Sequence, residues 1–375
     1  MSFNITRISS VALATSLILA GTLDAQSKVY SFHIEKPIPV KNQDGQVIKL
    51  VGMQGNSVTF QLGEVGEASI PIDEESKIKF TFPYPDNFSD FQFNVLNGNY
   101  PMALRLIDSP IDLLRFLAVP EPNCNFHLYT ELYYRALSYS GGGKEALEAT
   151  AAVPWGHPNV PPVFIQHASV LLNRMVGEQK IDASRQLLAI MQEGLSIDQF
   201  AQLALPVADK LRLINENELV ESIYDALSKS TDPEIRALGR MWTAYNYANT
   251  GRIDDAKKLL KEIGEVTEEN PLFAIFCLAN GRLALSEQES VPALRYLSRA
   301  MVRTSIADSY KPEIYFLMIQ SYMLVEDRLP AKRLAKEMAV FYPTNMWRKS
   351  IVERYPKLEE EIKAEEPIKP ETEEI

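Results

Sequence analysis

The sequence is poor in the side chains that most enzymes use for chemistry. Its 375 residues include only four histidines and two cysteines, Cys124 and Cys277. A disulfide scaffold needs more cysteines, and these two lie far apart along the chain, so we expect both thiols to be buried and inert. The nucleophile elbow, the zinc-protease motif and the glycine-rich dinucleotide loop are all absent. We therefore predict a protein that is not an enzyme and binds no metal or cofactor.

Two short segments resemble chemical motifs but lack an essential part. Residues 140–145 read SGGGKE, whereas a phosphate-binding loop needs Ser or Thr after its lysine, where Glu145 stands. We expect this segment to be a turn between two helices. Cys124 and His127 have the spacing of two zinc ligands, but no second pair lies nearby to complete a site.

Positive charge is also scarce. The net charge is -11, and no stretch of the chain is strongly basic. This argues against nucleic-acid binding and against attraction to an anionic membrane surface. Residues 362–375 are acidic and contain two prolines. We predict a disordered tail there, because such a segment has too little apolar surface to fold.

Long apolar runs are missing, apart from one short run near the start. Arg7 precedes an apolar stretch at residues 11–20, and Leu23 and Ala25 suit the positions before a cleavage site. About ten apolar residues are too few to span a bilayer comfortably. We expect residues 1–25 to be a secretory signal peptide, with an uncleaved anchor as the alternative. The mature protein is then exported, periplasmic or secreted, without membrane insertion.

Residues 28–82 alternate with a period near two, which is typical of β-strands. Gly45, Gly55 and Gly63 fall between the apolar runs and suit tight turns. Five short strands predict a small all-β domain, curled or SH3-like, that ends at Pro83. We expect it to cap the first helices, and a separate binding module is the alternative. The predicted strands are Val29–Ile34, Gln46–Met53, Asn56–Leu62, Glu67–Ile72 and Lys77–Phe82.

From residue 87 the apolar spacing becomes helical, and one pattern recurs. A turn residue is followed three to five positions later by a small or β-branched residue, and the spacings of that residue are 43, 37, 37, 36, 37 and 38. Because a small side chain lets two helices approach closely, the pattern indicates stacked helix pairs. Four residues further on, every side chain except Thr150 suits a core. The small residues are Ala103, Ala146, Ala183, Val220, Ala256, Ala293 and Ala331.

This pattern resembles the tetratricopeptide repeat (TPR) family. Tyr247, Gly251 and Ala256 match the family's positions in one unit, and Ala331 and Pro343 have the family's separation in the last. The period is longer than the family's usual value of about 34 residues, and the Leu-Gly pair is mostly missing from the first helices. The resemblance covers residues 87–361. It implies a mostly α protein, a TPR-like α-solenoid of about seven helix pairs.

The resemblance also implies where a partner would bind. In solenoids of this class the first helix of each pair lines the concave face. Arginine can fork onto a carboxylate and tyrosine can bury a flat ring, so we expect a protein or peptide partner there. Packing between repeats is the alternative role. The Asn and Lys set used for C-terminal carboxylate capture is absent. The groove residues are Arg135, Met241, Tyr245, Arg282, Phe316 and Gln320.

Three functions follow from these features. The first is an exported protein–protein interaction scaffold of the bacterial cell envelope. The second is a structural module at the cell surface that docks through its β-domain. The third is an enzyme whose site forms only in space, for which four histidines provide little material. Since the fold hosts many partners, the sequence does not name one.

Overall fold

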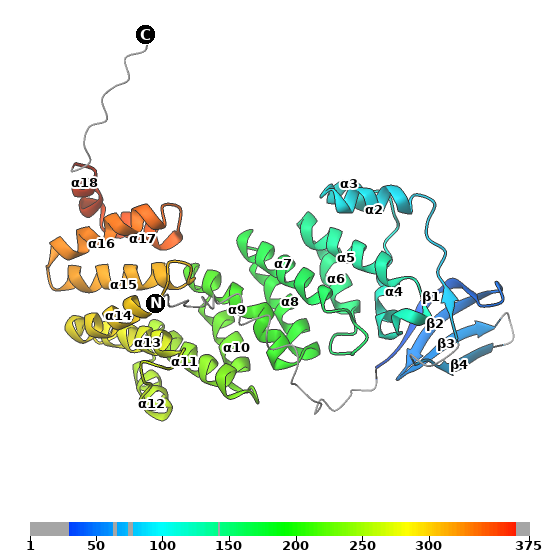
Figure 1. Ribbon diagram of the computed structural model, residues 1–375, viewed down its shortest axis with the longest axis horizontal. Coiled ribbons are helices and arrows are strands. Elements are labelled where there is room, and N and C mark those ends of the chain that lie inside the picture. Colours follow the sequence, from blue (N-terminus) through cyan, green and yellow to red (C-terminus); the bar gives the residue numbers. More distant parts are fainter. Residues whose placement is uncertain (1–29, 63–65, 74–77, 142, 365–375) are drawn as a thin grey trace, which may run out of the picture. The chain divides into compact units, whose positions relative to one another are not determined.

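The computed structural model describes residues 30–62, 66–73, 78–141 and 143–364. The protein is mostly helical and begins with an antiparallel sheet (Figure 1). These residues form two compact units, an N-terminal unit up to residue 207 and a C-terminal unit from residue 208. The expected signal peptide and residues 365–375 of the expected tail lie outside the described residues. Within the described ranges, no helix has both the length and the apolar character needed to cross a bilayer.

The N-terminal unit opens with a five-stranded antiparallel sheet in the order β4-β3-β2-β1-β5. All five predicted strands are present, but β1 continues eight residues beyond the predicted end at Ile34. The register with β2 shifts between His33 and Ile38, a stretch that includes Pro37, and the pairing then continues through Pro39 to Lys41. The strands are β1 (Ser31–Asn42), β2 (Val47–Gln54), β3 (Ser57–Leu62), β4 (Gly66–Pro71) and β5 (Phe80–Thr81).

Gly52 allows β1 and β2 to approach closely at this irregularity. A Cβ atom at Gly52 would lie 2.3 Å from the carbonyl oxygen of Phe32, so no other residue fits without moving β1. The pairing of β2 with β3 also shifts register between Leu50 and Gly52. The two shifts curl the sheet around an apolar interior that includes Val58 and Phe60, both buried as the alternation predicts.

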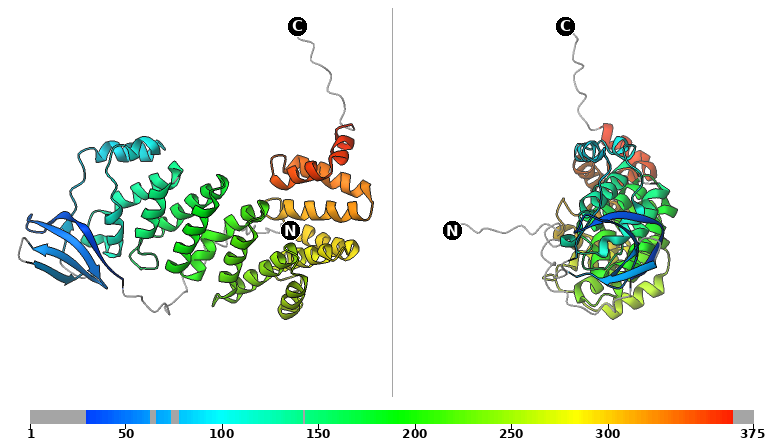
Figure 2. Two further views of the ribbon diagram at one scale, coloured as in Figure 1. Left: turned by 180° about the vertical axis from the view of Figure 1, so that it is seen from behind. Right: turned by 90° about the vertical axis from the view of Figure 1, so that its right-hand side faces the viewer.

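The sheet packs on the helical segment that follows it (Figures 1 and 2). The ring of Phe32 meets Phe116 edge to face at 4.9 Å. The Asn125 side chain accepts a hydrogen bond from the Phe82 backbone N–H at 2.7 Å and donates one to the Phe82 carbonyl at 3.0 Å. The side chain thus holds the end of the β-domain as a neighbouring strand would. The contacted segment contains the short helices η1 (Arg115–Ala118) and η2 (Glu121–Asn123).

The remaining chain is a succession of helices, most of them joined in pairs by short turns. The pairs are α2 (Phe88–Leu96) with α3 (Tyr100–Leu104), α5 (His127–Ser140) with α6 (Lys144–Ala152), α7 (Val163–Gly177) with α8 (Ile181–Gly194), α9 (Ile197–Leu213) with α10 (Asn217–Ser228), α11 (Pro233–Asn249) with α12 (Ile253–Ile263), α13 (Phe273–Ser286) with α14 (Ser290–Arg303), and α15 (Lys311–Leu324) with α16 (Arg328–Phe341). Helix α4 (Ile111–Leu114) precedes η1, and α17 (Met346–Arg354) and α18 (Pro356–Ala364) follow the last pair.

The turn inside each pair has the same geometry. One residue adopts a positive φ, between 57° and 108°, and five residues later a small or β-branched side chain is fully buried. In six turns the residue after the positive-φ position donates to a carbonyl five residues earlier, at 2.8–3.0 Å, which is the Schellman arrangement. The turn therefore fixes which residue of the second helix faces the first. The residue couples are Gly98 and Ala103, Gly141 and Ala146, Gln179 and Ser184, Asn215 and Val220, Gly251 and Ala256, Gln288 and Ala293, and Glu326 and Ala331.

Two details of the predicted repeat are wrong. In α8 the buried small residue is Ser184, whose hydroxyl donates to the Lys180 carbonyl, and Ala183 is only partly buried. Thr150 is fully buried although a polar residue was not expected in the core. Its hydroxyl donates to the Ala146 carbonyl at 2.7 Å and is bonded to the Tyr134 hydroxyl at 2.9 Å. Both polar atoms are accommodated because local hydrogen bonds compensate for their loss of water.

First and second helices of the C-terminal unit are buried differently. Helix α15 buries ten of its 14 residues, whereas α16 buries three of its 14, along one stripe. A helix that is apolar on most sides belongs in an interior, and one with a single stripe belongs at the surface. Polar residues on first helices of this unit therefore enter the interior and need partners there.

The turn geometry predicts opposite effects for two glycine substitutions. Gly251 has φ +81° and open space where a methyl group would lie, so Gly251→Ala meets only backbone strain. We expect it to lower the free energy of unfolding by about 1 kcal/mol. Gly177 ends α7 with open space and no positive φ, so Gly177→Ala should raise stability by a few tenths of a kcal/mol or more. Urea unfolding measures both, and a change of the same sign in the two variants would contradict this account of the turn.

The buried His127 predicts a loss of stability in mild acid. Its Nε2 atom hydrogen-bonds the Val119 carbonyl at 2.9 Å, and burial lowers the pKa of His127 below its ordinary value. The unfolded chain, with a pKa of about 6.5 there, therefore binds the proton more readily than the folded chain. Stability should fall as the pH drops below about 6.5 and until the lowered pKa is reached. Urea unfolding between about pH 7.5 and about pH 5 measures this loss, and the free energy of unfolding should fall less steeply in His127→Gln than in the wild type. An equally steep fall in the variant would mean that another group causes the loss of stability.

Candidate functional site

The C-terminal unit contains a buried network of charged and aromatic side chains centred on Arg212. This arginine, near the end of α9, is 3% exposed, and Glu313 at the start of α15 is 1% exposed. The Arg212 Nη2 atom lies 2.9 Å from Glu313 Oε2 and 2.7 Å from Asp209 Oδ1. Its Nη1 atom donates to the Tyr224 hydroxyl, and the Tyr245 hydroxyl donates to Glu313 Oε1. Both oxygens of Glu313 are thus engaged.

Aromatic rings pack against this network. The guanidinium of Arg212 lies 4.0 Å from the centroid of the Trp242 ring, a cation–π contact. Burial raises the pKa of Tyr245 well above its ordinary value, and the charge of Glu313 raises it further. Burial by itself lowers the pKa of Arg212, but nearby negative charges, Glu313 first, outweigh it and the net pKa is raised. The network therefore consists of a charged arginine, two carboxylates and neutral tyrosines.

A cavity of about 420 Å³ adjoins this network. Its wall includes Arg212 and Glu313 from the network, Arg282 from α13, and the rings of Phe316 and Trp347. The two rings pack with their centroids 4.9 Å apart. The volume lies within the range of small-ligand sites, roughly 300–1,000 Å³. The cavity is thus lined by charged and polar side chains together with aromatic rings.

The structure brings some of the predicted groove residues together. Tyr245, Arg282 and Phe316 all line the cavity. Met241 is 2% exposed and packs in the interior. Gln320 is half-buried on α15, and its Oε1 atom is buried without a hydrogen-bond partner among the described residues. Arg135, in contrast, belongs to α5 of the N-terminal unit and is half-buried there.

Sequence reasoning missed the two residues at the centre of the network. Arg212 follows the buried Leu211 and lies four residues after the buried Ala208. An arginine on the apolar side of α9 was therefore the signal that could have identified it. Nothing in the local pattern points to Glu313 as its partner, because the two are 101 residues apart. Trp347 was not among the predicted groove residues either.

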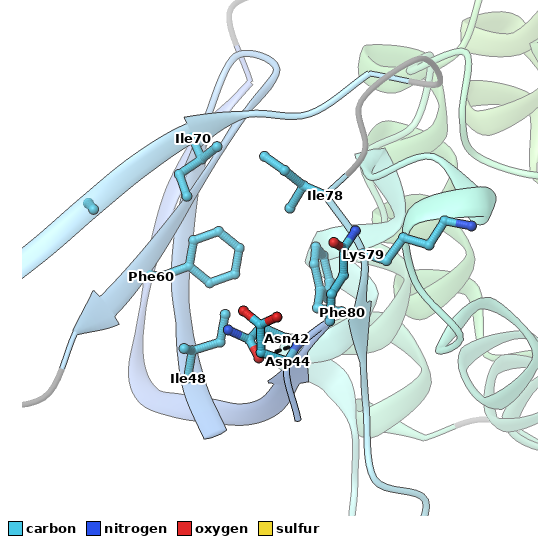
Figure 3. A pocket seen from close by; sticks show the side chains of 10 residues that line it. Asn42, Asp44, Ile48, Phe60, Ile70, Ile78, Lys79 and Phe80 are labelled. Atoms are coloured by element: carbon cyan, nitrogen blue, oxygen red, sulfur yellow. Dashed lines mark hydrogen bonds between the residues drawn. The ribbon is translucent and has the colours of Figure 1, made fainter. Parts of the chain in front are cut away.

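A second cavity, of about 230 Å³, lies inside the curl of the sheet. Figure 3 shows Phe60 and Ile70 on one side of it and Ile78 and Phe80 on the other, with Asp44 near its base. Most of the side chains that line the cavity are apolar, and Asp44 and Lys79 add one charge of each sign. The cavity is suited to an apolar side chain of a ligand.

The histidines and cysteines are occupied with local structure. His33 and His167 are bonded to Glu67 and Glu131, at 3.0 and 2.8 Å. His157 accepts a hydrogen bond from the Asn159 backbone. These contacts and that of His127 involve carboxylates and backbone groups, so they form no Ser–His or Cys–His pair. Among the described residues, no three His, Cys, Asp or Glu side chains are grouped to hold a metal ion.

Both cysteines are buried and free. Burial raises the pKa of Cys124 to about 12 and that of Cys277 to about 11. Since the thiolate is the nucleophile, these groups are poor reactants at neutral pH. The expectation of buried thiols is confirmed.

Comparison with known proteins adds no identification. A scan against protein-family models finds no match, and a search of curated proteins finds no similar one.

The Arg212 network predicts a strong coupling between distant residues. Glu313→Leu leaves a buried guanidinium short of its main partner, so we expect the free energy of unfolding to fall by about 3 to 5 kcal/mol. Arg212→Met combined with Glu313→Leu should recover most of this loss, because an apolar pair replaces the buried charges. As a control, Glu262→Leu breaks the exposed pair with Arg240, 2.9 Å long, and should cost less than about 1 kcal/mol. Additive losses in the double variant would contradict the coupling.

Proposed function

We propose that the chain is an exported protein–protein interaction scaffold of the bacterial cell envelope. The observation that carries the proposal is the repeated helix pair, in which a positive-φ turn precedes a fully buried small residue by five positions. Units of this kind bury their apolar faces against neighbours, as stacked repeats do. In this proposal the helices form a TPR-like α-solenoid, and the curled sheet is an SH3-like domain at its start.

The first helices supply the proposed binding surface. Arg282 and Gln320 are half-buried, and each has a buried polar atom without a hydrogen-bond partner among the described residues. An unpaired buried polar atom is costly, and a bound partner would supply the missing hydrogen bonds. We propose an extended peptide or a partner helix as the occupant. Tyr245, Met241 and Phe316 support this surface from the interior, where they are buried.

Affinity capture from an envelope extract tests the scaffold. The bait is the chain from residue 26 onward, and the variant bait carries Arg282→Ala with Gln320→Ala. We expect one protein to be captured by the first bait and lost from the second, because the variant removes the side chains that the partner would satisfy. The matched control carries Arg299→Ala with Arg303→Ala, which lie on the outer helix α14 and pair with Glu268. Equal capture by all three baits would contradict the proposed binding surface.

A second function, docking of the β-domain to a wall component or a larger assembly, is favoured by the apolar cavity in Figure 3. Ile70 lines it, is 36% exposed and belongs to β4, at one end of the strand order. If Ile70→Lys abolishes capture while Val47→Lys does not, the β-domain is the docking element. Val47 is a fair control because it is 65% exposed in the same sheet and does not line the cavity.

A further inference from the structure

Helix α17 contributes a polar and aromatic face to the cavity beside the Arg212 network. Trp347, Ser350, Glu353 and Arg354 all line this cavity. Residues three and four positions apart lie on the same side of a helix, so these four side chains form one face of α17. The other lining residues come from α11, α13 and α15 and from the end of α9 with the turn that follows it. The cavity therefore lies within the C-terminal unit.

The charges around the cavity cancel. Three arginines and two glutamates line it, and Asp209 adds a third carboxylate 2.7 Å from Arg212. With no surplus of either sign, the cavity favours neither an anion nor a cation, and an uncharged ligand fits it best. The arginines are Arg212, Arg282 and Arg354, and the carboxylates are Asp209, Glu313 and Glu353.

The most deeply buried of these charges already have partners. Both oxygens of Glu313 accept hydrogen bonds, one from Arg212 and one from Tyr245. A charged group of a ligand would have to displace a member of this buried network, and breaking a buried ion pair is costly. This argues against a charged ligand, including a zwitterion, in the enclosed part of the cavity.

Other polar groups of the wall are free to form hydrogen bonds. The carboxylate of Glu353, the side chain of Asn215 and the indole N–H of Trp347 have no hydrogen-bond partner among the described residues. Asn249 donates to Asn217 at 3.2 Å, which leaves its own Oδ1 atom as an acceptor. The wall thus offers both donors and acceptors. A hydroxyl group is matched to such a wall because it donates one hydrogen bond and accepts others.

The rings of Phe316 and Trp347 limit the shape of the ligand. Their centroids are 4.9 Å apart and their planes are tilted by 38°, so the rings contact each other. They cannot hold a flat aromatic ligand between them, but they can receive a ligand on one side. The C–H face of a sugar ring packs on an aromatic ring while its hydroxyl groups reach polar neighbours. The cavity, at about 420 Å³, is large enough for such a ligand.

We propose that this cavity binds an uncharged saccharide, with a sugar ring against Trp347 and hydroxyl groups bonded to Glu353, Asn215 and Asn249. The balanced charge, the unused donors and acceptors and the aromatic rings are all properties that such a ligand matches. The inference goes beyond the proposed scaffold, because it concerns a small ligand and requires no protein partner.

A glycan array tests the proposal without prior choice of a sugar. The fluorescently labelled chain is applied to an array that carries uncharged and acidic saccharides. We expect it to bind a group of uncharged saccharides that share one sugar, and the free sugar should compete. At about ten times its dissociation constant, that sugar should raise the Tm of the chain by about 2 to 4 °C.

Two variants of α17 assign the binding to this cavity. Trp347→Leu removes the larger ring and should abolish binding, and Glu353→Ala removes two acceptors and should weaken it roughly tenfold or more. Glu353 is exposed, so its loss should leave Tm without ligand unchanged. The matched control is Phe341→Leu, since Phe341 is a 46% exposed aromatic residue of α16 that does not line the cavity. This control should bind as the wild type does.

The proposal is overturned if no uncharged saccharide is bound, if both cavity variants bind as the wild type does, or if Phe341→Leu abolishes binding as well. Glu353→Ala leaves Arg282 and Gln320 in place. A loss of saccharide binding in this variant therefore reports on the cavity and not on the proposed protein-binding surface.

Discussion

The distance of five residues between a left-handed turn residue and a buried small side chain determines most of this structure. The turn ends the first helix and sets the start of the second, as at Gly251 and Ala256. The small residue then lets the two helix backbones approach. The same spacing returns in all seven pairs of the described residues, so one local geometry determines how the two helices of each pair approach each other.

This arrangement also explains why charge is found in the interior. First helices such as α15 are covered on most sides, so some polar residues on them lie away from water. Glu313 and Arg212 resolve this by pairing with each other and with tyrosine hydroxyls. Arg282, at the edge of the same cavity, is half-buried, and its Nε atom has no hydrogen-bond partner among the described residues.

Much of the fold was predictable from the sequence because its cause is local. The alternation of apolar and polar residues predicted the strands. The recurring small residue predicted that Ala256, Ala293 and Ala331 are buried, as they are. The errors have local causes too. The first strand was predicted to end at Ile34, but after a shift in its register with β2 it continues to Asn42. Thr150 was excluded as polar, although hydrogen bonds inside one helix pair allow its burial.

The candidate site was predictable only in part. Tyr245, Arg282 and Phe316 follow from their helix positions, and all three line the cavity. Glu313 could not be predicted as the partner of Arg212, because two residues 101 positions apart produce no periodic pattern in the sequence. Its place depends on how several helix pairs stack, which no single repeat encodes.

The buried thiols have a practical consequence for spectroscopy. With pKa values of about 12 and 11, Cys124 and Cys277 are ionised in fewer than about one molecule in a thousand at neutral pH. Maleimide reagents therefore have almost no native target. A cysteine introduced at one exposed position in each unit would carry a pair of dyes on an otherwise wild-type chain. Energy transfer between them would measure the separation of the two units directly in solution.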